Sequence, residues 1–202
     1  MTSFEESFIK SINFKTAEIT NQNIQSRIRG TLLMALANQE NHLLLSTGNK
    51  SELAVGYCTL YGDMNGGLSV IGDLYKTNVF KLCNWLDSKE SINHRKSHML
   101  ATKINIIGKN ILTKAPSAEL GPDQLDTDSL PPYSILDNIL KGIIEEKKDL
   151  KQLEEDGHKT ELIIQVISLI KKAEFKRKQA PPILKLSSQS LGSDWRFPIA
   201  IS

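Results

Sequence analysis

The chain has 202 residues, enough to bury the core of one domain, and 40% of them are hydrophobic while 24% are charged. This balance is typical of a soluble globular protein, and no apolar run approaches the ~18 residues of a membrane span. The formal net charge of +2 argues neither for nor against nucleic-acid binding. Cys58 and Cys83 are isolated and lack metal-ligand spacing, as expected in the reducing cytoplasm, so we interpret both as small buried hydrophobic side chains.

The first predicted helix follows a segment with weak periodicity and no turn chemistry at residues 1–19, which we interpret as a lead-in that needs a partner surface. Thr20 is a candidate N-cap for this helix, whose Ile and Leu side chains at residues 28–36 would form an apolar stripe. Asn23 and Arg27 are four residues apart and would share a different face of the helix.

The central stretch begins with an apolar run at residues 43–45, which is too short for a helix and lacks alternation, and therefore predicts a buried strand. Residues 47–49 would end this strand, and Lys50 would begin a helix. A strand that ends in a small polar turn and leads into a helix delivers its side chains to the carboxyl edge of a parallel sheet, where α/β proteins bind ligands. We therefore expect Thr47 and Glu52 to face the same crevice.

A second short strand is predicted at residues 68–71, followed by a helix at residues 76–86. Lys76 would lie at the start of this helix, where the helix dipole disfavours a cation. Its position therefore indicates a nearby anionic ligand, with an ordinary surface lysine as the alternative. Residues 88–110 are polar and irregular, which predicts a variable loop.

The C-terminal part begins with a proline-bounded loop at residues 116–132. We interpret its aspartates as solvated. A loop of this length without periodicity more often has a function than not. Two amphipathic helices follow, with apolar stripes within residues 135–144 and 162–170. The mixed charges between them, at residues 145–156, indicate solvated surface. Five basic residues within 171–178 fit a nucleic-acid or a phosphate contact, but only one aromatic side chain interleaves them.

Four groups of motifs occur together in a fixed order. The chain reads Asn-Ile-Gln-Ser-Arg-Ile-Arg-Gly at 23–30, Thr-Gly-Asn-Lys-Ser-Glu at 47–52 with Tyr-Gly-Asp at 61–63, Lys-Ala-Pro-Ser-Ala-Glu-Leu at 114–120 with Pro-Asp-Gln at 122–124, and Glu-Phe-Lys-Arg-Lys-Gln-Ala-Pro-Pro at 174–182. Taken together, these motifs resemble the synthetase domain of glutamine-dependent NAD synthetases, which belong to the N-type ATP pyrophosphatases; any one of them alone would be weak evidence. The resemblance runs from about residue 20 to the C-terminus.

The resemblance implies an α/β fold in which helices flank part of a doubly wound parallel sheet, as in adenine nucleotide alpha hydrolases. Residues 1–202 would form the C-terminal part of the synthetase domain, with a lead-in at 1–19, a variable insertion at 88–110 and an extended tail at 180–202. The family holds the ATP pyrophosphate with a Ser-Gly-Gly-x-Asp-Ser loop, which does not occur among the 202 residues, and a glutaminase domain is also missing. We therefore expect a fragment that needs the N-terminal half of the enzyme and is inactive alone.

The reaction of the family adenylates the nicotinate carboxylate of deamido-NAD with ATP, and ammonia obtained from glutamine then displaces AMP to give NAD. The substrate carboxylate attacks the α-phosphate, so catalysis depends on positioning and on neutralising phosphate charge with Mg²⁺ and lysine. The resemblance implies ATP and Mg²⁺ as cofactors, a cytoplasmic homo-oligomer, and neither a membrane nor a nucleic-acid partner. It gives no residue of this chain a catalytic role.

The resemblance also implies binding residues. For ATP these are Thr47, Lys76 and Ser117. For deamido-NAD they are Asn23, Arg27, Glu52, Tyr57, Cys58, Thr59, Leu60, Asp63 and Lys176. Glu52 is the candidate ligand of Mg²⁺, which prefers oxygen ligands. Asp63 has an equally good structural explanation as a turn-capping aspartate.

Two other interpretations stay open at this point. The chain could be a non-catalytic dinucleotide-binding or regulatory remnant, or a basic, helical nucleic-acid-binding protein. Protection by a dinucleotide in a melting experiment separates the last interpretation from the others, because a ligand at 100 times its dissociation constant adds ~2.7 kcal/mol to stability.

Overall fold

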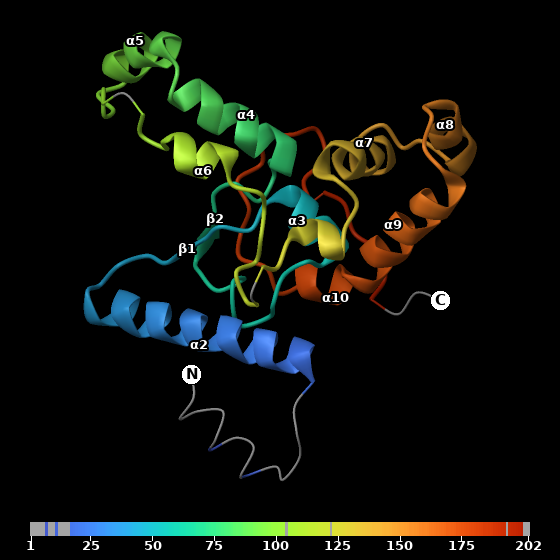
Figure 1. Ribbon diagram of the computed structural model, residues 1–202, viewed down its shortest axis with the longest axis horizontal. Helices are drawn as coiled ribbons and strands as arrows, with labels where there is room; N and C mark the ends of the chain where they lie inside the picture. Colours follow the sequence, from blue (N-terminus) through green and yellow to red (C-terminus); the bar gives the residue numbers. More distant parts are fainter. Residues whose placement is uncertain are drawn as a thin grey trace.

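The computed structural model describes residues 7, 11, 17–103, 105–121, 123–192 and 194–199 (Figure 1). Most of the lead-in expected at residues 1–19 therefore lies outside the described residues. In chain order, the elements are α2 (Glu18–Gln39), β1 (Leu45–Ser46), α3 (Lys50–Val55), β2 (Leu68–Ser69), α4 (Lys76–Leu86), α5 (Lys89–Ser97), α6 (Lys109–Thr113), the 3₁₀ helix η1 (Asp126–Asp128), α7 (Tyr133–Ile144), α8 (Leu150–Glu155), α9 (Thr160–Lys172) and α10 (Glu174–Arg177).

Helix α3 lies at the centre of the fold and packs against α4, α7, α9 and α10 (Figure 1). A helix of six residues is unstable by itself, so α3 depends on this packing, which buries its Leu53, Ala54 and Val55. The apolar stripes predicted for the two C-terminal helices are confirmed except at Ile135, which is 38% exposed, and both helices pack against α3. Their most deeply buried members are Leu136, Ile139, Leu140 and Ile144 of α7, and Ile163, Val166 and Ile170 of α9.

The described sheet is short and parallel. Leu45 of β1 pairs with Leu68 of β2, and Ser46 pairs with Ser69. A single parallel bridge joins Ser69 to Ile183, so the C-terminal tail runs beside β2. The parallel pairing of strands that are followed by helices confirms an α/β arrangement.

The buried strand predicted at residues 43–45 is wrong in both position and burial. The strand begins only at Leu45, and the side chains that were expected inside are outside: Leu43 is 66% and Leu45 is 46% exposed, while Ser46 is buried. The described residues cover the side chains of Leu43 and Leu45 only in part, so their apolar character does not translate into burial.

Helix α2 contacts the rest of the fold mostly through small residues. Its buried residues are Ile24, Ser26, Gly30 and Ala37. A Cβ atom on Gly30 would lie 2.8 Å from the carbonyl oxygen of Gly62, so the two backbones approach each other too closely for any side chain at position 30.

Two predictions for α2 are wrong. The helix begins at Glu18 after Ala17, which makes no side-chain cap, so Thr20 is not the N-cap. The stripe at residues 28–36 is not a buried face, because Leu32, Leu33 and Leu36 are 50% to 65% exposed. Among the described residues, neither α2 nor any other helix combines the length and apolar character needed to cross a membrane.

Helices α4, α5 and α6 form an arm at one end of the molecule (Figure 1). The bounds predicted for α4 are confirmed, although none of its residues is fully buried. The irregular loop predicted at residues 88–110 is wrong in part, because α5 begins there after Ser88, whose hydroxyl accepts the backbone N–H of Ser91. The Asp87 carboxylate closes the arm by accepting the N–H groups of Ile107 and Gly108 at 2.9 and 2.8 Å.

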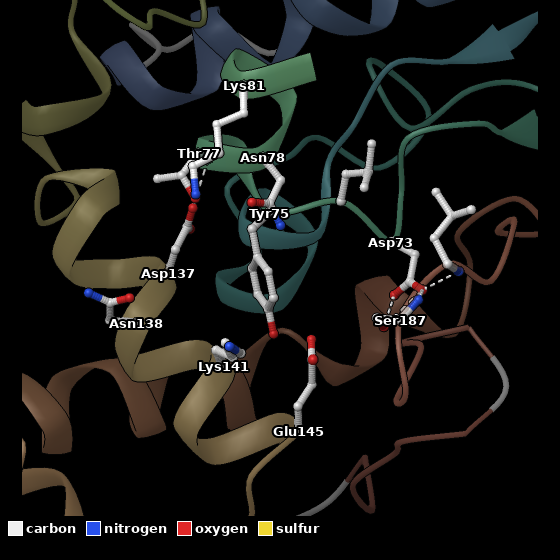
Figure 2. Close-up of a pocket in the computed structure, with 12 residues that line it drawn as sticks. Asp73, Tyr75, Thr77, Asn78, Lys81, Asp137, Asn138, Lys141, Glu145 and Ser187 are labelled. Atoms are coloured by element: carbon white, nitrogen blue, oxygen red, sulfur yellow. Dashed lines mark hydrogen bonds between the residues drawn. The ribbon is translucent and has the colours of Figure 1, made fainter. Parts of the chain in front are cut away.

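A buried ionic network attaches the C-terminal tail to the start of α3. Lys50 is fully buried, and its Nζ lies 3.1 Å from Asp73 Oδ1 and 2.9 Å from Glu145 Oε1. Lys50 also donates to Ser187 Oγ at 2.7 Å, and Asp73 accepts the N–H groups of Leu186 and Ser187, both at 2.7 Å. Asp73 and Ser187 face each other in Figure 2. Glu145, predicted as solvated surface, is therefore partly buried and ion-paired.

Candidate functional site

The turn between β1 and α3 fixes the Glu52 carboxylate. Asn49 caps α3 by accepting the backbone N–H of Glu52 at 3.1 Å, and Glu52 Oε2 accepts the N–H of Asn49 at 3.2 Å. This reciprocal capping box satisfies two backbone donors that the helix itself leaves free. At its other end, α3 stops at Gly56, which has the left-handed φ of 72°, so the chain turns sharply and leads Tyr57 away from the helix.

Glu52 also forms an ion pair with Lys76. Glu52 Oε1 lies 2.8 Å from Lys76 Nζ, and the ammonium group lies 5.4 Å from the centroid of the Tyr133 ring. Glu52 therefore already supplies the negative charge that the position of Lys76 at a helix start led us to expect from a ligand.

A cavity of about 220 Å³ opens between α2, the segment after α3, and α10. It brings together six of the nine residues predicted for deamido-NAD, namely Asn23, Tyr57, Cys58, Thr59, Asp63 and Lys176. These residues come from three stretches that are far apart in the sequence, so their convergence is a property of the fold.

Hydrogen bonds tie α2 to the floor of this cavity. Thr59 Oγ1 donates to Asn23 Oδ1 at 3.0 Å, and Arg27 Nε donates to the carbonyl oxygen of Leu60 at 3.1 Å. The prediction that Asn23 and Arg27 share one helical face is therefore confirmed. Arg27 and Leu60 lie next to the cavity without lining it, and Leu60 takes part in this hydrogen bond through its backbone.

Lys176 brings a positive charge to the same cavity. Its Nζ donates to the carbonyl oxygens of Gly56 and Cys58, both at 2.7 Å, and so holds the turn after α3 in place. The neighbouring Arg177 points inward, where it pairs with the buried Glu174 at 2.7 Å. Two cations of the basic run are thus engaged inside the protein, which argues against a nucleic-acid surface there.

Burial shifts the pKa of three titratable groups of the cavity towards the neutral form. Burial raises the pKa of the Cys58 thiol to about 12, against the opposing effect of Lys176. Burial, followed by the nearby Asp126, raises the pKa of Tyr57 to about 12. Asp63 is exposed as a residue, but its carboxylate turns inward; desolvation raises its pKa although the N–H of Thr59 donates to it at 2.6 Å. The Cys58 thiol and the Tyr57 hydroxyl are thus not activated as nucleophiles at neutral pH.

The three residues predicted for ATP do not line one common cavity. Thr47 is exposed and lines a neighbouring cavity of about 230 Å³ between α2 and β1. Lys76 is paired with Glu52, and Ser117 lies in a third hollow, where its Oγ accepts the N–H of Glu119 at 3.0 Å. The cavities that contain Thr47 and Lys176 nevertheless share Asp63 in their linings.

Several residues of the site were missed from the sequence. Gln22, Ala118, Leu120 and Gln124 also line the 220 Å³ cavity. Asp126, interpreted as solvated, is buried and accepts the Tyr133 hydroxyl at 2.8 Å. The loop sequence around Asp126 does not distinguish a buried carboxylate from a solvated one.

Comparison with known proteins decides the family, because the model of the NAD synthase family matches residues 1–180. The chain belongs to the NAD synthase family. The glutamine-dependent NAD(+) synthetase of Synechocystis sp. is 48% identical over 200 residues, which are 99% of this chain and 33% of that protein. That of Thermotoga maritima is 46% identical over 182 residues, 90% of this chain and 30% of that protein. This NAD synthase family chain therefore spans about a third of the length of these relatives.

Solved structures give the same fold for this NAD synthase family chain. A glutamine-dependent NAD(+) synthetase from Cytophaga hutchinsonii matches 100% of the chain and 32% of its own length, with a TM-score of 0.73 and 24% identity. An NMN synthetase from Francisella tularensis matches 92% of the chain and 63% of its own length, with a TM-score of 0.66 and 27% identity. The resemblance drawn from the motifs, and the α/β fold class it implied, are confirmed.

Proposed function

We propose that this chain is the C-terminal part of the synthetase domain of an NAD synthetase, a ligase that converts deamido-NAD to NAD with ATP and ammonia through an adenylated intermediate. The observation that supports this most directly is the cavity in which Asn23, Thr59, Asp63 and Lys176 converge. The remaining partners of the reaction, among them the N-terminal half, glutamine-derived ammonia and a second copy of the enzyme in the cytoplasm, are part of this proposal.

In the proposed complex, the 220 Å³ cavity receives one end of deamido-NAD. This volume lies below the roughly 300 to 1,000 Å³ of a typical ligand pocket, so it suits a part of a dinucleotide. The neighbouring cavity near Thr47 shares Asp63, Ala118 and Leu120 with it, so the two cavities are adjacent and an extended ligand would occupy both. Lys176 would supply charge to the anionic substrate, while Asn23 and Thr59 would orient it by hydrogen bonds.

ATP would contact Thr47, Lys76 and Ser117. Among the described residues, no three His, Cys, Asp or Glu side chains are arranged to hold a metal ion, and the carboxylate proposed for Mg²⁺ is that of Glu52. One carboxylate is enough when phosphate oxygens and water complete the coordination. When bound, Mg²⁺ would neutralise phosphate charge, and Lys76 would have to leave Glu52 to meet a phosphate.

The residues of this chain would act by positioning. Because the carboxylate of the substrate is the nucleophile, the neutral Tyr57 and Cys58 can line the cavity without competing with it. The α3 cap holds Glu52 in a fixed orientation, and the bonds of Lys176 hold the turn of residues 56–58.

A pair of lysine variants tests this proposal. Lys176→Met keeps the apolar stem and removes the charge in the cavity, while Lys178→Met makes the same change at an exposed position two residues later. We expect deamido-NAD to raise the Tm of the wild-type chain and of Lys178→Met, and to raise that of Lys176→Met much less. Absence of any shift in the wild type at millimolar deamido-NAD would contradict the proposed binding.

A turnover assay tests the fragment interpretation. The chain is incubated with ATP, Mg²⁺, deamido-NAD and ammonium, and the NAD formed is measured. We expect none above background, because the 202 residues contain no Ser-Gly-Gly-x-Asp-Ser loop for the pyrophosphate. Turnover near that of a full-length family member would disprove this part of the proposal.

A further inference from the structure

The N-terminus of α4 has no cap of its own. Tyr75 occupies the N-cap position and makes no side-chain hydrogen bond to the helix. The first N–H groups of a helix need partners, and here two distant side chains provide them. The N–H of Lys76 donates to Ser51 Oγ at 2.9 Å, and the N–H of Thr77 donates to Asp137 Oδ2 at 2.9 Å.

These two side chains are also bonded to each other. The Ser51 hydroxyl donates to Asp137 Oδ1, and both residues are buried. Figure 2 shows Asp137 reaching from α7 to the start of α4 at Thr77. One carboxylate therefore joins α3, α4 and α7 at a single point, and its negative charge lies where the dipole of α4 favours an anion.

The residues next to this junction are those proposed to meet the nucleotide. Ser51 precedes Glu52 on α3, and the backbone that Ser51 binds is that of Lys76. The same two short segments are thus linked twice, once by the Lys76 N–H and Ser51 and once by the Lys76–Glu52 ion pair. If the first link were lost, only the ion pair between two partly exposed side chains would fix the position of Lys76. Such an ion pair is a weak restraint.

We propose that Asp137 is a positioning residue, which acts through Ser51 and the N-terminus of α4 to hold the backbone of Lys76 next to Glu52, from where the Lys76 side chain can turn to nucleotide phosphate. This inference rests on the proposed function for the contact with ATP. Asp137 itself faces backbone and Ser51, and touches neither Lys76 Nζ nor Glu52 through any hydrogen bond of the described structure.

Two variants and one control separate positioning from general stability. Asp137→Asn keeps the shape but replaces one of the two acceptor oxygens by a donor, and Ser51→Ala removes the bridging hydroxyl. Ile163→Val, a buried change on α9, lowers stability without touching α4. Figure 1 places α9 on the opposite side of α7 from the α4 arm.

The first measurement is amide hydrogen exchange by NMR on the chain itself. In Asp137→Asn and Ser51→Ala, we expect the amides of Lys76 and Thr77 to lose protection by about tenfold more than those of α9, as local opening of the helix start requires. In Ile163→Val, the loss of amide protection should be similar in α4 and α9. Equal loss across α4 and α9 in Asp137→Asn would overturn the proposal.

The second measurement is the affinity for ATP with Mg²⁺, from the ligand-induced rise in Tm, with Lys76→Met as the reference. We expect Asp137→Asn to weaken ATP binding about tenfold, which is the lower end of the effects seen when a residue that orients a ligand-binding side chain is lost. Ile163→Val should leave ATP binding unchanged. If Lys76→Met weakens binding and Asp137→Asn does not, the positioning proposal is wrong. If the wild-type chain does not respond to ATP, the proposed ATP contact fails instead, and the exchange pattern alone decides the role of Asp137.

Discussion

Glu52 and Lys76 form an ion pair in which Oε1 and Nζ are 2.8 Å apart and the side chains are 17% and 20% exposed. The other oxygen of the same carboxylate, Oε2, accepts the N–H of Asn49 and caps α3. Glu52 thus has a structural and a proposed functional task at the same time, and only a variant that separates the two can assign the residue to the site.

Glu52→Gln makes that separation. Glutamine also completes a capping box, so α3 keeps its cap while the crevice loses one negative charge. Stability should fall by less than about 1 kcal/mol, the usual scale for an ion pair that solvent can reach. In an enzyme that contains the other part of the synthetase domain, kcat at saturating Mg²⁺ should fall by about 10², the scale of one lost electrostatic contact in a preorganised site. Normal kcat with a lowered Tm would remove Glu52 from the site.

The Cys58 thiol should be unreactive at neutral pH. Because burial raises its pKa to about 12, we expect the native thiol at pH 8 to react with iodoacetamide about 10³-fold more slowly than an unfolded cysteine of pKa ~8.5. The rate should rise about tenfold per pH unit from pH 9 to 11, because the thiolate fraction rises in that proportion. A Cys83→Ser background isolates the signal, and equal rates in native and denatured protein would contradict the burial of the thiol.

Removal of the Lys50 charge should destabilise the protein strongly. In Lys50→Met, Asp73 and Glu145 lose the cation between them, and breaking a buried pair on one side costs about 3 to 5 kcal/mol. Urea unfolding measures the loss. The double variant Lys50→Met/Asp73→Asn should lose less than the sum of the two single changes, and strict additivity would show that the two residues do not interact.

The pH dependence of stability should report on Asp73. Burial raises its pKa, but the N–H groups of Leu186 and Ser187, the Ser187 hydroxyl and Lys50 outweigh this effect and lower the pKa overall. A carboxyl whose folded pKa lies below its unfolded value of ~3.9 stabilises the protein above that pH, and the contribution is lost as the pH falls through the folded pKa. Asp73→Asn should therefore flatten the decline in unfolding free energy below about pH 4. An unchanged slope would contradict the assignment.

The exposed leucines of α2 should make the isolated chain associate. Leu32 and Leu36 are four residues apart and expose more than half of their surface, and β1 has no described partner on its second edge. We expect the chain to bind a hydrophobic dye and to form oligomers, and Leu32→Gln/Leu36→Gln to reduce both without lowering the Tm. Ile164→Gln, at an isolated exposed position on α9, is the control. A monodisperse wild-type monomer that binds no dye would disprove the prediction.

The parts of the fold that were correctly predicted carry strong local signals. The 3.6-residue period of α7 and α9 and the start of α4 after a turn could be recognised from a few neighbouring residues. Helix α2 shows the opposite case. It buries Ser26 and Gly30 rather than its leucines, because its contact with the segment at residues 59–63 requires close backbone approach, which hydrophobic periodicity does not encode.

The candidate site was predicted by motif and not by geometry. The resemblance named six of the residues that line the 220 Å³ cavity. No local sequence pattern, however, predicted that α2, the turn after α3 and α10 would meet there. The junction of Ser51 and Asp137 was missed for the same reason, since the two residues are 86 positions apart and each looks like an ordinary helix residue.

The attachment of the tail to Asp73 sets an order of events during protein synthesis. Leu186 and Ser187 reach Asp73 across 113 and 114 positions of the chain, and Ser187 reaches Lys50 across 137. At about 5 to 20 residues per second, a ribosome needs roughly 7 to 27 s to make that intervening segment. During this interval, Lys50 and Asp73 lack their hydrogen bonds to the tail, and α3 lacks the restraint that these bonds provide. Docking of residues 186–189 against Lys50 and Asp73 can therefore take place only late in synthesis.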